Sequence, residues 1–165
     1  DGLMHFVLSP EDFVPVLALA LLVGLRGAAY GRRTLFILPL AWFLGGVAGT
    51  WAAARAANPY LTAGWFLLLG GLLAFDARLS LRMFTGLAVL LGLSHGYLNG
   101  SGMGELGTSA VALLGLVFAV FVQVALAASL VVQMQVHWAK IAVRVAGSWI
   151  AGSGLLLLGW AVRTR

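Results

Sequence analysis

Long apolar segments separated by short polar stretches dominate this chain of 165 residues. Each segment is close to the roughly 20 residues that an α-helix needs to cross the hydrocarbon core of a bilayer. The pattern therefore predicts an all-α, polytopic membrane protein, built as one integral domain over residues 1–165 with about six transmembrane helices. The predicted spans are residues 10–25, 34–54, 60–75, 83–98, 108–132 and 143–162.

Glycine, proline and charged residues mark the predicted connections between these spans. Residues 26–33 close the first hairpin, residues 57–59 break the second and residues 76–78 form the third. Residues 99–104 form the fourth connection and are predicted to be too rich in glycine to stay helical. The fifth connection contains His137, Lys140 and Arg144.

The composition supports a lipid environment. Hydrophobic residues make up 62% of the chain and charged residues only 9%, whereas a soluble domain carries about 25% charged residues. A soluble core of this size cannot hide so much apolar surface, so the lipid bilayer is the first predicted partner. The absence of cysteine excludes disulfides and thiolate metal sites. The net charge of +5 lies mainly in short loops, as is usual for membrane proteins, and no nucleic-acid partner is predicted.

The positive charges predict the orientation of the bundle. The first, third and fifth connections carry seven Lys and Arg residues and the opposite side carries three, so these connections are expected in the cytoplasm. The seven are Arg26, Arg32, Arg33, Arg78, Arg82, Lys140 and Arg144, and the three are Arg55, Arg163 and Arg165. Both termini are then expected outside a bacterial-type inner membrane, which agrees with removal of a signal peptide before Asp1.

Two ridges of small residues are predicted to be contacts between helices. Small side chains let two backbones approach closely in a membrane, either within one bundle or at a homodimer face. We expect packing within the bundle. The ridges are Gly45-Gly46 with Gly49-Thr50 on the second span, and Gly147, Ala151 and Gly152 on the sixth.

Two groups of polar residues beside apolar spans are predicted to converge on the outer side of the membrane. Polar groups in such a position are costly, so they usually have a function. Imidazole together with carboxylate and amide oxygens suits a borderline divalent ion such as nickel, cobalt, zinc or copper(II). The candidate metal ligands are His5, Glu11 and Asp12 at the outer end of the first span, and His95, Asn99 and Glu105 at the outer end of the fourth span and in the loop after it.

The acidic pair has a second interpretation as part of a helix start. Ser9 is a good N-cap, Pro10 suits the first turn, and Glu11 and Asp12 lie at the positive end of the helix dipole. Asp12 follows Ser9 by three residues, which fits a capping box. Helix capping and metal ligation are therefore both open for these two acids.

Other polar residues have less specific interpretations. Gln123 lies in mid-span and must find a partner inside the bundle, either as packing or as a substrate contact. His137 is expected at the inner interface. Ser94 and His95 are adjacent and point about 100° apart on a helix, so they do not form a nucleophile–base pair and no enzyme is predicted. Two histidines on one side, His5 and His95, are also compatible with haem ligation.

At these residues the chain resembles the HupE/UreJ family, small membrane proteins accessory to nickel hydrogenases and ureases and regarded as nickel or cobalt permeases. The family opens its first span with Gly-x-x-His-Pro-x-x-Gly-x-Asp-His and carries a His-Gly-x-x-x-Gly motif near the end of a middle span. His5 stands at the first histidine position, Glu11 at the acid position and Asp12 at the second histidine position. In the second motif His95 matches, and Asn99 stands where many members have a further histidine.

The resemblance implies binding and transport of a divalent transition metal, nickel or cobalt first, through an outward-facing site. His5, Asp12 and His95 would form that site, with Glu11, Asn99 and Glu105 as supporting ligands. It implies no organic cofactor, and it implies a metalloenzyme maturation system or other membrane subunits as partners. The competing hypothesis is a structural or accessory subunit of a larger membrane complex in which the ancestral metal site is lost or vestigial.

Overall fold

The computed structural model describes residues 8–52, 58–105, 110–134 and 137–163, and these ranges contain helices and no strand. The predicted all-α class is therefore confirmed. The helices are α2 (Pro10–Arg26), α3 (Ala28–Thr50), α4 (Pro59–Ala74), α5 (Leu81–Glu105), α6 (Ala110–Gln133) and α7 (His137–Arg163).

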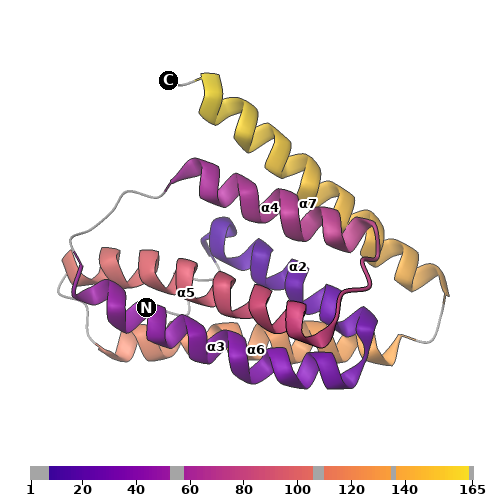
Figure 1. The fold of residues 1–165 in the computed structure, drawn as a ribbon, viewed down its shortest axis with the longest axis horizontal. Helices are drawn as coiled ribbons and strands as arrows, with labels where there is room; N and C mark the ends of the chain where they lie inside the picture. The colour runs from indigo at the N-terminus through magenta and orange to yellow at the C-terminus, as the bar shows by residue number, and fades with distance from the viewer. Residues whose placement is uncertain (1–7, 53–57, 106–109, 135–136, 164–165) are drawn as a thin grey trace.

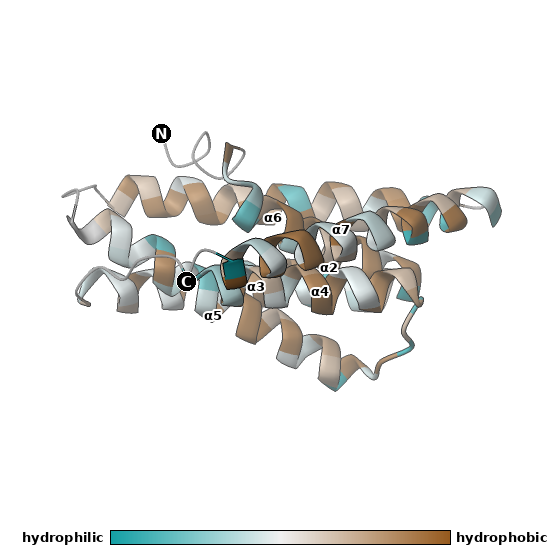
Figure 2. Cartoon of the chain, turned by 90° about the horizontal axis from the view of Figure 1, so that it is seen from above, coloured by the Kyte–Doolittle hydropathy of each residue, from teal (hydrophilic) through white to brown (hydrophobic). Residues whose placement is uncertain are grey.

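Four of these helices are long and apolar enough to cross a membrane. They are α3, α6, α7 and residues Leu81–Met103 of α5. α4 is apolar but has 16 residues, and α2 has 17. At 1.5 Å per residue, α2 is about 25 Å long, shorter than the hydrocarbon core of about 30 Å. Figure 2 shows hydrophobic residues along most of the length of the bundle.

The short helix α2 is the centre of the bundle. It lies between the α4–α7 pair on one side and α3, α5 and α6 on the other (Figure 1), and it contacts all five other helices. Val16, Leu19, Leu22 and Val23 of α2 are fully buried. Because its neighbours surround it, α2 does not need the full length or the lipid-facing surface of an isolated spanning helix.

Glycine lets α3 and α5 approach until their backbones touch. A Cβ atom on Gly45 of α3 would lie 2.5 Å from the carbonyl oxygen of Leu93 on α5. A Cβ atom on Gly96 of α5 would collide with the carbonyl of Trp42 on α3. The first predicted ridge of small residues therefore packs within the bundle, as expected.

The second ridge packs α7 against α4. A Cβ atom on Gly70 of α4 would lie 2.5 Å from the backbone nitrogen of Ala151, and one on Gly147 would lie 2.6 Å from that of Ala74. Gly152 faces open space, because a Cβ atom added there would have no heavy atom of another residue within 4 Å. The contact with α4 thus uses two of the three predicted small residues.

The first and fifth connections are much shorter than predicted. α3 begins at Ala28, so Gly27 alone joins it to α2, with a φ of +106° that glycine adopts without steric cost. α7 begins at His137, so Lys140 and Arg144 lie on its first turns rather than in a loop. In lipid, continuing a helix satisfies backbone groups that a loop would leave open, which favours short connections.

The prediction that residues 99–104 leave the helix is wrong, because α5 runs to Glu105. Gly100 of this segment and Gly96 one turn before it face α3, where a side chain would collide with backbone atoms of α3. These glycines therefore serve close packing and do not end the helix.

The longer α5 changes the depth of His95. His95 lies 14 residues after Leu81 and 10 before Glu105, or about 21 Å and 15 Å from the two ends of the helix at 1.5 Å per residue. The predicted position at the outer end of the span is therefore wrong, and His95 lies near the middle of its helix.

Candidate functional site

Three of the predicted site residues meet in a hydrogen-bonded group. Asp12 lies in the first turn of α2, and His95 and Asn99 are one turn apart on α5. His95 Nδ1 lies 2.8 Å from Asp12 Oδ1, and Asn99 Nδ2 donates to Asp12 Oδ2 at 2.9 Å. Asn99 Nδ2 also lies 3.0 Å from the carbonyl oxygen of His95. The two sequence motifs, 83 residues apart at Asp12 and His95, are thus in direct contact.

The group is shielded from solvent. Asp12 is 4% exposed and His95 is 3% exposed. The His95 imidazole packs beside Trp42 of α3, with ring centroids 5.5 Å apart, and beside Trp65 of α4 at 6.3 Å. Four helices therefore enclose the imidazole, and the low local dielectric strengthens its interaction with the carboxylate.

The second ring nitrogen of His95 has no hydrogen-bond partner among the described residues, although it is buried. A carboxylate has only acceptor atoms, so the nitrogen facing Asp12, Nδ1, carries a proton. In the neutral imidazole Nε2 then holds a lone pair. Buried polar atoms without a partner are uncommon in proteins, and each calls for an explanation.

Asp12 does not act in a capping box. Ser9 has the extended backbone of an N-cap, but its side chain makes no capping hydrogen bond. Both carboxylate oxygens of Asp12 are used by α5 instead. Glu11 is exposed, unlike Asp12, and so keeps its interpretation as an acid in the first turn of a helix.

Gln123 of α6 contacts the same end of α2. Its Nε2 donates to the carbonyl oxygen of Phe13 at 2.9 Å, and its Oε1 is buried without a partner among the described residues. The partner that its mid-span position requires is thus the backbone of α2.

Two tryptophans beside His95 were not predicted as site residues. Trp138 and Trp160 of α7 are exposed, as suits anchors at a membrane interface. Trp42 and Trp65 are instead buried beside the imidazole. Their positions within spans, rather than at the span ends, were the available signal.

The remaining predicted ligands are not brought together by the described part of the chain. His5 lies outside the described residues. Glu105 ends α5, and its side chain is also outside them. Within the described residues, no three His, Cys, Asp or Glu side chains form a group that could hold a metal ion.

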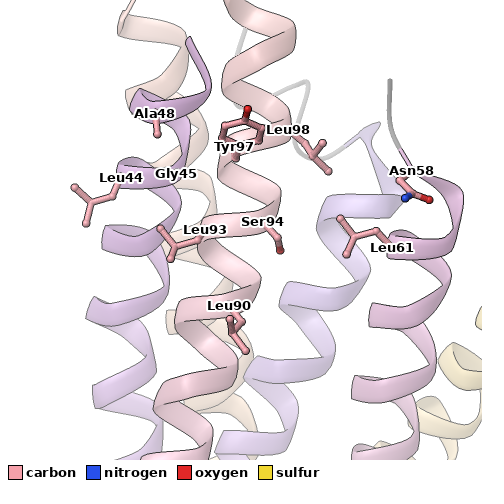
Figure 3. A pocket seen from close by; sticks show the side chains of 10 residues that line it. All are labelled: Leu44, Gly45, Ala48, Asn58, Leu61, Leu90, Leu93, Ser94, Tyr97 and Leu98. Atoms are coloured by element: carbon pink, nitrogen blue, oxygen red, sulfur yellow. The ribbon is translucent and has the colours of Figure 1, made fainter. Parts of the chain in front are cut away.

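A groove of about 620 Å³ runs beside this site but does not include it. Figure 3 shows it between α3 and α5 on one side and the start of α4 on the other. Leucines form half of its lining, and Asn58, Ser94 and Tyr97 add polar atoms. The hydroxyl of Ser94 donates to the carbonyl of Leu91 at 3.1 Å, so Ser94 is not paired with His95.

Comparison with known proteins adds a family to this geometry. The family model described as HupE / UreJ protein matches residues 1–157. No curated protein and no solved structure matches the chain. The family match covers both motifs and all six described helices, α7 up to residue 157. The chain, a helical membrane bundle in which the buried Asp12 and His95 are hydrogen-bonded and Asn99 donates to Asp12, therefore belongs to the HupE/UreJ family.

Proposed function

We propose that this chain binds a divalent transition-metal ion within the membrane and carries it across, with nickel and cobalt as the first candidates. Membership of the HupE/UreJ family suggests an accessory or transport function connected with nickel or cobalt. The family is one of accessory and transport proteins and is linked to hydrogenase and urease maturation.

The observation that carries the proposal is the buried Nε2 atom of His95, which has no hydrogen-bond partner in the part of the chain that the structure describes. Histidines that bind metals commonly donate their other ring N–H to a carboxylate, which fixes the tautomer and the ring orientation. Asp12 accepts from Nδ1 in this way at 2.8 Å. The lone pair on Nε2 is then available to a metal ion.

This arrangement gives Asp12 a supporting role. Its two oxygens are engaged by His95 and Asn99, so we assign it to orienting the imidazole rather than to direct ligation. The amide nitrogen of Asn99 points at Asp12, and its Oδ1 is the atom that could ligate an ion.

One imidazole does not complete a coordination shell. We assign the further ligands to His5, to water and to Asn99, with Glu11 and Glu105 as acids along the approach to the site. His5 precedes Asp12 by seven residues, a separation of at most about 25 Å in an extended chain, which allows it to reach His95. An ion held by imidazole and oxygen ligands fits nickel, cobalt or zinc.

The depth of His95 supports transport over surface capture. Substrate sites of secondary transporters lie near the bilayer midplane, and His95 is near the middle of α5. A bare charge at that depth is costly, so a ligand there serves an ion that passes through.

The second candidate is an accessory subunit that does not transport. The hydrogen bond between Asp12 and Asn99 favours it, because these two residues satisfy each other without an ion. The absence of a three-ligand group among the described residues points the same way. In that case the polar group would hold α2 and α5 together within a larger complex.

Metal binding by the purified full chain in mild detergent tests the proposal. Ni²⁺ and Co²⁺ are titrated against the parent, His95→Ala, and the double variant His5→Ala/His95→Ala, with metal content measured by elemental analysis. His137→Ala is the matched control, because His137 is exposed at the opposite end of the bundle. Near-stoichiometric metal in the parent and His137→Ala, lost in the other two, supports the site.

Uptake of the same ions into proteoliposomes then separates the two candidates. Uptake by the parent but not by His95→Ala supports transport. Binding without uptake supports the accessory subunit, and no binding by the parent overturns the metal site.

A further inference from the structure

We propose that Gln123 is a positioning residue whose side-chain amide holds the first turn of α2 where Asp12 meets His95. This inference concerns the polar group itself. It rests on the proposed function only for the nickel measurement described below.

The first turn of α2 lacks two of the hydrogen bonds that a helix start can have. The side chain of Ser9, the N-cap residue, makes no capping hydrogen bond. Pro15 lies inside the helix and has no N–H, so it cannot donate to the carbonyl of Glu11. The backbone N–H groups of Asp12 and Phe13 both donate to the carbonyl of Ser9 at 3.0 Å, and side chains from other helices add to these bonds.

Two neighbouring helices hold adjacent residues of this turn. From α5, His95 and Asn99 contact the carboxylate of Asp12. From α6, Gln123 donates to the carbonyl of Phe13 at 2.9 Å. Since adjacent Cα atoms are only about 3.8 Å apart, a displacement of the Phe13 carbonyl displaces Asp12 as well.

A hydrogen bond connects Gln123 to the α2 turn that meets His95. α6 packs mainly against α2 and α3, and both of these helices also contact α5, which carries His95. The side-chain amide of Gln123 bonds to α2, so the first turn of α2 is the polar connection between Gln123 and the imidazole.

The burial of Gln123 argues against a role as simple filler. The residue is 9% exposed, and its Oε1 is buried without a partner among the described residues. An apolar side chain of similar length would fill the same space without leaving a buried oxygen unpaired. The feature that only the amide supplies is the hydrogen bond to Phe13.

Nuclear magnetic resonance on the full chain labelled with ¹⁵N-histidine reads the Asp12–His95 bond directly. The Nδ1–H proton of His95 is assigned by its loss in His95→Gln, and its exchange with water is measured. Gln123→Met removes both polar atoms at similar volume. Gln123→Asn keeps the amide but shortens its reach, and it decides the matter if Gln123→Met does not fold. Gln133→Met is the matched control, because Gln133 is exposed on the same helix.

If Gln123 positions Asp12, Gln123→Met and Gln123→Asn speed the exchange of this proton about two- to tenfold, the effect expected for one hydrogen bond. Gln133→Met leaves it unchanged. Lower thermal stability with an unchanged Nδ1–H signal in both Gln123 variants would mean that Gln123 only packs, and it overturns the inference.

Nickel affinity is the second measurement. We expect it to fall about two- to tenfold in Gln123→Met, in parallel with the change in proton exchange. If the parent binds no nickel, the proposed function fails, while proton exchange still decides the role of Gln123.

Discussion

Asn99 Nδ2 lies 2.9 Å from Asp12 Oδ2, so one hydrogen bond joins α5 to the first turn of α2. By the resemblance to the HupE/UreJ motifs, Asp12 stands at the second histidine position of the first motif, and Asn99 stands where many members have a further histidine. Two departures from the motifs are therefore in contact with each other. An acid facing an amide forms a satisfied pair, whereas either residue facing an apolar side chain would leave a buried polar group unpaired.

Replacing Asp12 is the first prediction. Asp12→Ala leaves the buried Nδ1 of His95 without its acceptor, which costs about 1–3 kcal/mol of stability, whereas Asn99 Nδ2 keeps the carbonyl oxygen of His95 as an acceptor. Loss of the orienting carboxylate also weakens nickel binding about 10- to 100-fold. Unfolding curves in detergent and metal titration measure the two effects.

Glu11→Ala is the control for this prediction, because Glu11 is the exposed neighbour of Asp12. We expect it to change stability by no more than about 0.5 kcal/mol. Equal effects of the two substitutions would contradict the assigned role of Asp12.

The dependence of binding on pH is the second prediction. A metal ion and a proton compete for Nε2 of His95, because only the neutral imidazole has a lone pair there. Nickel affinity should therefore fall as the pH is lowered from 8 to 5, because protonation of the imidazole removes the lone pair that binds the ion. Titrations between pH 5 and 8 test this, and an affinity that does not change over the range would assign binding to carboxylates alone.

The helices were predictable from sequence where their ends have local signals. Ser9-Pro10 and Gly27 bracket α2, and its observed range of Pro10–Arg26 agrees with the predicted span within one residue. The end of α5 was not predictable in this way. The sequence around Gly100 is compatible both with the end of a helix and with close packing of one helix against another. Only the position of α3 beside Gly100 shows that the glycine packs within the helix.

The candidate site was predictable in part for a similar reason. Counting spans places Asp12 and His95 toward the same side of the membrane, and their contact follows that topology. The span count does not show that the first turn of α2 meets α5 near the middle of that helix. Nor does it show that Trp42 and Trp65 enclose the imidazole, because that depends on which helices become neighbours.

Opposite effects of alanine at two glycines of α5 are the third prediction. In Gly96→Ala the new methyl group collides with the carbonyl of Trp42, and we expect a loss of about 1–3 kcal/mol. Gly86 has no heavy atom within 4 Å of its Cβ position, so Gly86→Ala should stabilise the helix by about 0.5–1 kcal/mol. Thermal unfolding in detergent compares them. A loss of similar size in both variants would argue against the close approach of α3 and α5.

The orientation of the bundle is the fourth prediction, and it can be tested because the chain has no native cysteine. Ser80 and Trp51 are exposed at opposite ends of the bundle, in the connections before α5 and after α3. Neither residue is charged, so substituting them leaves the charge balance between the two sides intact. The excess of Lys and Arg at the end that contains Ser80 predicts that this end lies in the cytoplasm. A membrane-impermeant maleimide should therefore label Trp51→Cys in intact cells and Ser80→Cys only after permeabilisation.

Leu155→Cys, which faces outward from α7, is the lipid-facing control and should resist the reagent under both conditions. The reverse pattern at the first two positions would invert the bundle, and an ion would then reach His95 through the shorter half of α5 from the cytoplasm.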